Sequence, residues 1–247
     1  MLTVHQFPCL SDNYGFLIRD EATGLAACID TPDAAAILRE LEQLGWTLNL
    51  ILNTHWHPDH AGGNEAIKAA TGAFVIGPQE VEKIAAPDRV VVDGDVVMLG
   101  ETRLDVIDTG GHTLGHITYH DAADHIAFVG DTLFALGCGR LFEGTPAQMW
   151  GSLQKLAAMP DDTTVYCAHE YTASNARFAL SVDKAPALTA RAEQVFAARE
   201  RGEPTVPTTI GLEKATNPFL RAPVLAPGMA DYEAFGKIRA AKDSFKG

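Results

Sequence analysis

Short apolar segments separated by turn-forming residues occupy most of the chain before residue 170 and predict a strand-rich region. Residues 34–44 differ, because their apolar positions recur at helical spacing between a capping residue, Asp33, and a stop at Gly45. Two more helices are expected over 64–70 and 148–159. The expected strands cover 3–7, 14–18, 25–29, 48–52, 74–76, 90–92, 96–98, 104–107, 117–119, 126–129 and 163–168.

The strand pattern stops after Tyr171, and helical patterns continue to the end of the chain. The expected helices cover 174–182, 187–201 and 232–245, with a proline-rich connector at 203–207. We therefore expect one domain over residues 1–170 and a helical domain over residues 171–247. The β-then-α order occurs twice in the first domain, which indicates an α/β (α+β) fold with two sheets face to face and helices outside.

Composition limits the kind of protein that this chain can be. It has 247 residues, 47% of them apolar, which is enough to build a sizeable core. No apolar run approaches the ~18 residues that cross a bilayer, and no signal peptide precedes the first strand, so we expect a cytoplasmic protein with no membrane partner. The net charge of −13 repels phosphate backbones and argues against a nucleic-acid partner. The four cysteines lack C-x-x-C spacing, which predicts free thiols.

A dense group of metal-binding side chains follows the apolar run 48–52. His55, His57, Asp59 and His60 are four potential ligands within six positions. The spacing is too tight for the helical H-E-x-x-H motif, so we place these ligands on a loop where a buried strand ends. Imidazole favours zinc, iron and similar metals, and one tetrahedral ion could not use all four ligands and keep an open position. A polar loop with chance histidines is the disfavoured alternative.

Three other expected strands also end in potential ligands. His112 lies in a glycine-rich loop, Asp131 follows the strand over 126–129, and His169 follows the strand over 163–168. Together with the first group, these residues can bind two metal ions with a bridging solvent molecule. Zinc, iron and manganese all accept such donors.

The order of these residues resembles the metallo-β-lactamase superfamily, in which an H-x-H-x-D-H motif, a later histidine, an aspartate and a final histidine follow one another. Segments 130–134, 137–145, 167–172 and 217–221 further resemble the glyoxalase II (hydroxyacylglutathione hydrolase) family. The resemblance implies a metallo-β-lactamase αββα sandwich with a C-terminal helical domain. It also implies hydrolysis of S-(2-hydroxyacyl)glutathione thioesters, such as S-D-lactoylglutathione, to D-lactate and glutathione, a step in methylglyoxal detoxification.

The resemblance also implies roles for the ligands. Two divalent metal ions are implied, with zinc preferred over iron or manganese. His55, His57 and His112 would bind the first ion, Asp59, His60 and His169 the second, and Asp131 both. Positions 55 and 57 point the same way on an extended segment, and the turn at Pro58 lets Asp59 and His60 face another centre. Asp59 and Asp131 are thus the implied catalytic residues, with a metal-bridging hydroxide as the nucleophile.

The implied glutathione site lies largely in the helical domain. Arg239 and Lys242 match an Arg-x-x-Lys pattern near the C-terminus, where they could pair with the glycyl carboxylate. Arg140 and Tyr171 would complete the site, whereas Phe142 stands where family members carry tyrosine, so one hydroxyl contact is missing. The alternative is that the basic pair only solvates an exposed helix face.

The remaining histidines are not expected to bind metal. His5, His116, His120 and His125 read as surface or structural residues, with His116 the best candidate to support a ligand. A catalytic thiol at Cys138 is disfavoured.

The alternative functions on this fold are those of a persulfide dioxygenase, a lactonase, an RNA-processing nuclease and a non-catalytic metal-binding module. We expect a monomer with loose selection of the acyl group.

Overall fold

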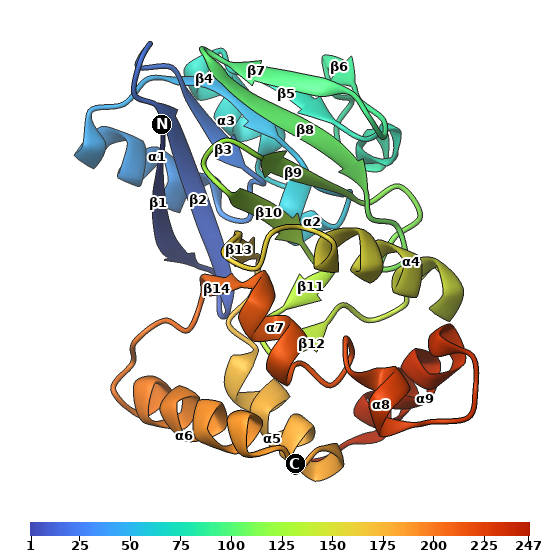
Figure 1. Ribbon diagram of the computed structural model, residues 1–247. Helices are drawn as coiled ribbons and strands as arrows, with labels where there is room; N and C mark the ends of the chain where they lie inside the picture. Colours follow the sequence, from blue (N-terminus) through green and yellow to red (C-terminus); the bar gives the residue numbers. More distant parts are fainter. The chain divides into compact units, whose positions relative to one another are not determined.

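A computed structural model describes the whole chain, Met1–Gly247, which divides into two compact units (Figure 1). Unit 1 contains Met1–Asp108 and Gly115–Gly130, and unit 2 contains Thr109–Leu114 and Asp131–Gly247. This packing division separates segments by their contacts. The boundary expected near residue 170, between a catalytic and a helical domain, stays a prediction.

The first sheet of unit 1 joins an antiparallel part to a parallel part. The order of its strands is β1-β2-β3-β4-β5-β6, antiparallel from β1 to β3 and parallel from β3 to β6. Buried parallel strands are largely apolar on both faces, which fits the four leucine and isoleucine residues of β4. The strands are β1 (Leu2–Cys9), β2 (Asn13–Asp20), β3 (Ala26–Ile29), β4 (Leu48–Leu52), β5 (Phe74–Gly77) and β6 (Arg89–Val90).

The second sheet of unit 1 is an antiparallel meander in the order β10-β9-β8-β7. Its strands are β7 (Val96–Leu99), β8 (Thr102–Asp108), β9 (Ile117–Asp121) and β10 (Ile126–Gly130). The two sheets pack face to face, with the rings of Phe16 and Phe128 5.9 Å apart between them. The buried Tyr119 hydroxyl donates to the carbonyl of Asn53 at 3.0 Å, which ties the second sheet to the segment that follows β4.

Helices cover the outer face of the first sheet of unit 1 (Figure 1). Asp33 accepts a hydrogen bond from the Ala36 N–H at 3.1 Å and so starts α1, and Gly45 ends it in the left-handed conformation. Ile37 of α1 is fully buried with Ile67 of α3 in one cluster against the strands. The helices of this unit are α1 (Ala34–Leu44), α2 (Pro58–Ala61), α3 (Asn64–Thr71) and the 3₁₀ turn η1 (Gln79–Lys83).

Unit 2 is mainly helical and contains two short pairs of strands. In its core, the ring of Phe219, which lies before α8, stacks on Phe178 of α5 and meets Phe235 of α9 edge to face. The elements are β11 (Leu133–Phe134), β12 (Gly137–Cys138), α4 (Pro146–Ala157), β13 (Thr164–Cys167), α5 (Thr172–Val182), α6 (Pro186–Glu200), β14 (Thr208–Thr209), α7 (Ile210–Thr216), α8 (Ala222–Leu225) and α9 (Asp231–Ser244).

The structure confirms the fold class and corrects several local expectations. The strand expected over 90–92 is only β6, because the Asp95 carboxylate accepts from the Val92 N–H at 2.9 Å and makes a turn there. The helix expected from residue 148 begins at Pro146, since Thr145 forms a capping box with Gln148. Sequence patterns also missed the short elements, which are α2, η1, β11, β12, β14, α7 and α8.

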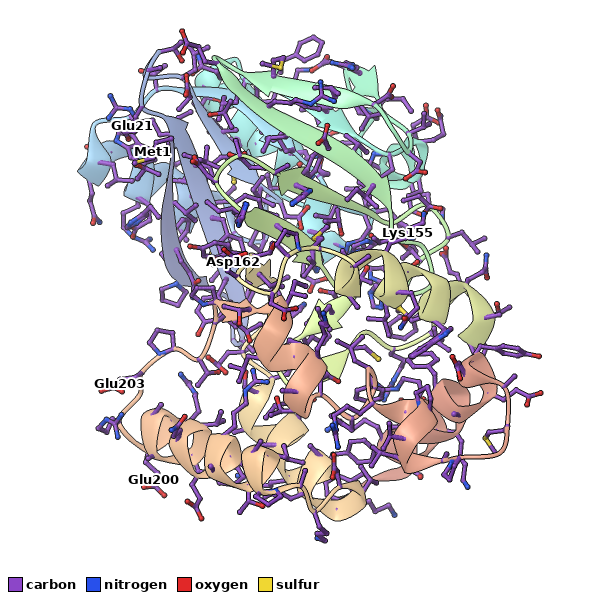
Figure 2. The ribbon with its side chains drawn as sticks, viewed as in Figure 1. Met1, Glu21, Lys155, Asp162, Glu200 and Glu203 are labelled. Carbon is purple, nitrogen blue, oxygen red and sulfur yellow. The ribbon has the colours of Figure 1, made fainter.

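The surface agrees with the acidic composition. The side chains of Glu21, Asp162, Glu200 and Glu203 are exposed, as Figure 2 shows for these labelled residues. No helix has the length and apolar character needed to cross a membrane.

Candidate metal centre

The first ligand group lies where β4 ends. The extended segment at His55 leads to Pro58, which starts the single turn α2 with His57 as its N-cap. Proline suits this position because its missing N–H would have no partner in a helix. Asp59 and His60 therefore lie on a helical turn rather than on the loop that the spacing suggested.

Distances within this group fit metal binding. The Nε2 atom of His55 lies 3.0 Å from Nδ1 of His57, and Nε2 of His60 lies 3.6 Å from a carboxylate oxygen of Asp59. Two nitrogens that bind one tetrahedral ion at about 2.0–2.1 Å lie roughly 3.3 Å apart. Both pairs have close to this separation, so the donors present fit a divalent cation.

Asp30 supports this group, and sequence reasoning missed it. It lies at the end of β3, is 5% exposed, and accepts a hydrogen bond from Nδ1 of His60 at 2.8 Å. Its carboxylate also accepts from the backbone N–H and the hydroxyl of Thr54 at 2.7 and 2.8 Å. The Thr54 oxygen in turn contacts Nδ1 of His55 at 3.0 Å. Such bonds to the far nitrogen fix the tautomer and direct Nε2 toward a metal.

Asn13 holds the candidate ligand Asp59 in a similar way. Its amide donates to the Asp59 carboxylate at 3.1 Å and to the Asp59 carbonyl at 3.3 Å. Thr31 N–H and the Asn53 amide donate to the His60 carbonyl at 2.7 and 3.0 Å. Asn13, the first residue of β2, lies 46 positions from Asp59, which is why it gave no sequence signal for this role.

His116 lies against the same ligands. It is fully buried, and its ring centre is 4.8 Å from that of His55. A Cβ on Gly130 would lie 2.6 Å from its Nε2, so only glycine fits beside this ring. This position agrees with a supporting rather than a ligating residue. The other histidines do not join a ligand group; His5 contacts Glu40 at 3.0 Å, and burial lowers the pKa of His120.

The second ligand group lies in unit 2 and centres on Asp131. One of its carboxylate oxygens is 3.3 Å from Nε2 of His112, and the other is 3.4 Å from Nε2 of His169. All three side chains are buried. A carboxylate whose two oxygens face two different histidines has the arrangement that a bridge between two cations requires.

The two histidines of unit 2 are held by their surroundings. Nδ1 of His112 donates to the Arg140 carbonyl at 2.8 Å, which leaves Nε2 to face Asp131. The ring of His169 stacks on Tyr171, with centres 4.6 Å apart and planes 3° apart. Phe134 packs edge-on against both rings.

Two of the expected substrate residues are exposed beside these ligands. Phe142 is 60% exposed and packs edge-on against His112, with ring centres 5.2 Å apart. The Arg140 guanidinium lies 5.9 Å from the Phe142 ring and 3.4 Å from the Asp243 carboxylate. Asp243 was not among the expected site residues.

The pair on α9 differs from the expectation that both residues project from one face. Arg239 is only 7% exposed, and it donates to the Cys138 carbonyl and the Asp243 carboxylate, each at 2.9 Å. Its guanidinium is therefore directed at groups of its own unit rather than at solvent. Lys242 is the more accessible residue, and it donates to the Ser174 carbonyl at 3.2 Å.

Cysteine chemistry does not contribute to this site. All four cysteines are buried free thiols. Burial raises the pKa of Cys138 to about 11, so this thiol stays protonated at neutral pH. This agrees with the expectation that Cys138 is not a nucleophile.

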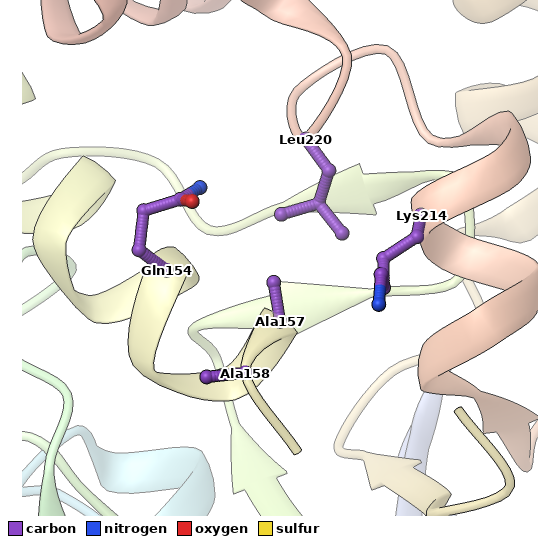
Figure 3. Close-up of a pocket in the computed structure, with 5 residues that line it drawn as sticks. All are labelled: Gln154, Ala157, Ala158, Lys214 and Leu220. Atoms are coloured by element: carbon purple, nitrogen blue, oxygen red, sulfur yellow. The ribbon is translucent and has the colours of Figure 1, made fainter. Parts of the chain in front are cut away.

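A separate pocket of about 370 Å³ lies in unit 2 between α4, α7 and Leu220 (Figure 3). Its lining includes Gln154 and Lys214 but none of the expected ligands. Lys214 pairs with Asp161 at 2.7 Å. The pocket therefore carries no part of the metal centre.

The role of Asp30 gives a testable prediction. Asp30→Asn keeps the size of the side chain but removes the charge that holds His60 and Thr54, so we expect metal affinity to fall by about tenfold to hundredfold. Metal content measured at a fixed free zinc concentration tests this. Asp33→Asn is the control, because Asp33 only caps α1. Unchanged metal content in Asp30→Asn would show that the contact has no supporting role.

Comparison with known proteins places these features in a family. A family model described as the metallo-beta-lactamase superfamily matches residues 21–169, and another described as the hydroxyacylglutathione hydrolase C-terminus matches residues 170–245. A crystal structure of ETHE1 from Myxococcus xanthus has a TM-score of 0.72 at 29% identity and covers 96% of this chain and 90% of that one.

Relatives of known name match the full length. A hydroxyacylglutathione hydrolase of Erythrobacter litoralis is 58% identical over 99% of this chain and 100% of its own. Another from Maricaulis maris is 57% identical over 99% of each chain. The chain therefore belongs to the hydroxyacylglutathione hydrolase family of the metallo-β-lactamase superfamily.

Proposed function

We propose that the chain is a binuclear metal-dependent hydrolase of S-(2-hydroxyacyl)glutathione thioesters such as S-D-lactoylglutathione. The observation that carries this proposal is Asp131, whose two oxygens face His112 and His169 at 3.3 and 3.4 Å. The relatives that share this chain's whole length are named for this hydrolysis. The expected products are a 2-hydroxy acid, here D-lactate, and glutathione.

The ligand assignment follows the family order. His55, His57 and His112 would hold one divalent cation, Asp59, His60 and His169 the other, and Asp131 both. Zinc is the proposed metal, and iron or manganese would suit the same nitrogen and oxygen donors. The separations within each unit support the assignment, because they match those between two ligands of one ion.

The reaction needs a nucleophile but no separate acid. When bound, the metals supply Lewis acidity and a water whose pKa is lowered towards ~7. Asp59 and Asp131 contribute negative charge that holds the cations in place. Glutathione leaves as a thiolate with a pKa near ~8.5, so it needs no proton donor in advance. The Cys138 thiol is not the nucleophile, because its raised pKa keeps it protonated at neutral pH.

We assign the glutathione moiety to cationic and aromatic groups of unit 2. Arg140, Lys242 and Tyr171 are at least partly accessible there and would bind the peptide part. Phe142 offers an apolar face and no hydroxyl. Arg239 stays in the proposed site, although its bonds to Cys138 and Asp243 favour an indirect contribution.

The alternative activities receive less support. A persulfide dioxygenase or a lactonase could use this fold, but the C-terminal region matches the hydroxyacylglutathione hydrolase model over residues 170–245. A non-catalytic module would not need the complete ligand set. We further propose a cytoplasmic monomer that acts in methylglyoxal detoxification, and a net charge of −13 argues against nucleic-acid substrates.

Hydrolysis of S-D-lactoylglutathione tests the proposal directly. We expect zinc-loaded protein to remove the thioester absorbance and release one thiol per thioester. Asp131→Ala should lose metal, and its turnover should fall by more than the roughly 100-fold typical for residues that only support ligands. Asp162→Ala, an exposed aspartate of the same unit, is the control. Failure of zinc-loaded, iron-loaded and manganese-loaded protein to hydrolyse the thioester would contradict the proposed function.

The pKa of Lys242 gives a pH-dependent prediction. Burial, aided by the guanidinium groups of Arg239 and Arg177 and opposed by Asp243, lowers the pKa of Lys242 to about 8. The ammonium group is therefore charged below about pH 8 and neutral above it. If it binds a substrate carboxylate, KM should rise several-fold as the pH increases through this value, after allowance for solvent screening.

Lys242→Arg provides the matched comparison, because arginine keeps its charge across this pH range. We expect its KM to vary less between about pH 7 and pH 9 than that of the unmodified chain. Comparing the two proteins removes any shared pH dependence of the metal centre. Identical pH profiles of KM would exclude Lys242 from carboxylate binding.

A further inference from the structure

The hairpin of β11 and β12 connects the proposed ligand Asp131 to the proposed substrate residue Arg140 along the chain. Its two-residue turn, Ala135–Leu136, is buried rather than exposed to solvent. Leu136 has a φ of 57°, a left-handed conformation that disfavours side chains with a Cβ. A buried, strained turn needs partners for its backbone groups and a reason to persist.

Two asparagine side chains supply the first partners. The amide of Asn217, fully buried after α7, donates to the carbonyls of Phe134 at 3.1 Å and Gly137 at 2.9 Å. The amide of Asn175 in α5 donates to the Ala135 carbonyl at 3.1 Å. A Cβ on Gly137 would lie 2.3 Å from the Asn175 amide nitrogen, so glycine permits this close approach.

Glu213 of α7 completes the set. It is fully buried, and one carboxylate oxygen accepts from the Leu136 N–H and the Asn217 amide, each at 2.9 Å. The other oxygen accepts from Arg191 of α6, which is 7% exposed. The Leu136 side chain packs into the apolar cluster of α5 and α6. The turn is therefore held by a charged pair, two amides and a core contact.

The strands of the hairpin transmit this position to the metal ligands. Where the hairpin ends, a Cβ on Gly139 would lie 1.9 Å from the Asp131 carbonyl and 3.2 Å from Nδ1 of His112. The next carbonyl, that of Arg140, accepts the bond from His112 at 2.8 Å. Displacement of the hairpin would thus move both the bridging carboxylate and the histidine that faces it.

We propose that Asn217 and Glu213 are positioning residues for the metal centre. They hold the β11–β12 hairpin so that Asp131 and His112 are placed for a cation before it binds. This inference rests on the proposed function only in taking these two residues as metal ligands. The helical part of the chain then contributes to metal affinity as well as to substrate binding.

Zinc affinity separates this role from a general contribution to stability. The measurement is the free zinc concentration at half-loading, set by a competing chelator at a temperature where circular dichroism shows folded protein. Asn217→Ala removes both donations to the hairpin, and Asn217→Asp keeps the size but places an oxygen against two carbonyls. We expect affinity to fall about tenfold to hundredfold in both variants.

Asp183→Ala is the matched control. Its carboxylate accepts from Arg221 at 2.8 Å in the same unit and is 7% exposed, so its loss also destabilises the helices without touching the hairpin. We expect its zinc affinity to stay within about twofold of that of the unmodified chain, since a twofold change is under 0.5 kcal/mol. Unchanged affinity in both Asn217 variants, or an equal loss in Asp183→Ala, would overturn the proposal.

Asn175→Ala provides a milder test if the Asn217 variants do not fold. It removes one bond to the hairpin, so we expect zinc affinity to fall about two- to tenfold, the effect of one net hydrogen bond. Unchanged affinity would overturn the proposal here too. These measurements use zinc alone, so a failure to hydrolyse S-D-lactoylglutathione would count against the proposed function and leave this test intact.

Discussion

The binuclear centre that we propose depends on electrostatic attraction between two cations and a shared Asp131 carboxylate. One of its oxygens lies 3.3 Å from His112 and the other lies 3.4 Å from His169. Each distance suits two ligands of one ion, so the two oxygens can each share an ion with a different histidine. Two cations at short range repel each other strongly, and a bridging anion offsets that repulsion. The surrounding residues must therefore restrict the thermal motion of this carboxylate and limit its hydration by water.

Buried polar contacts provide that rigidity in each unit. In unit 1, the Asp30 carboxylate joins the His60 imidazole to Thr54. In unit 2, Glu213 and Asn217 hold the hairpin that follows Asp131. Burying charged and amide groups is costly unless every donor and acceptor has a partner. We infer that these networks persist because they orient ligands, since an apolar core would serve packing alone equally well.

The sequence predicted most of the fold, because strand and helix periodicity reflects burial that local patterns record. Helix α1 lies where capping at Asp33 and the stop at Gly45 placed it. Sequence patterns missed the hairpin of β11 and β12, because its two-residue strands are too short to show any periodicity. They likewise missed α7, whose seven residues contain the buried Glu213, a residue type that patterns assign to the surface.

The same difference between local and distant information applies to the site. Within each unit, residues that a dense motif and strand ends had marked do lie together, His55 with His60 and Asp131 with His112. Asp30 and Asn13 contact His60 and Asp59 from about thirty or more positions away, and no local sequence pattern records contacts over that distance. Helical spacing predicted an accessible Arg239. That spacing cannot show that Arg239 turns inward and donates a hydrogen bond to the Cys138 carbonyl.

Calorimetric titration of the metal-free chain with zinc tests the central claim of two cations sharing Asp131. We predict binding that saturates at two zinc ions per chain. We also predict that Asp131→Asn, which keeps the shape of the side chain but removes its charge, binds at most one ion tightly. Saturation at one ion in the unmodified chain, or two tightly bound ions in Asp131→Asn, would contradict this claim.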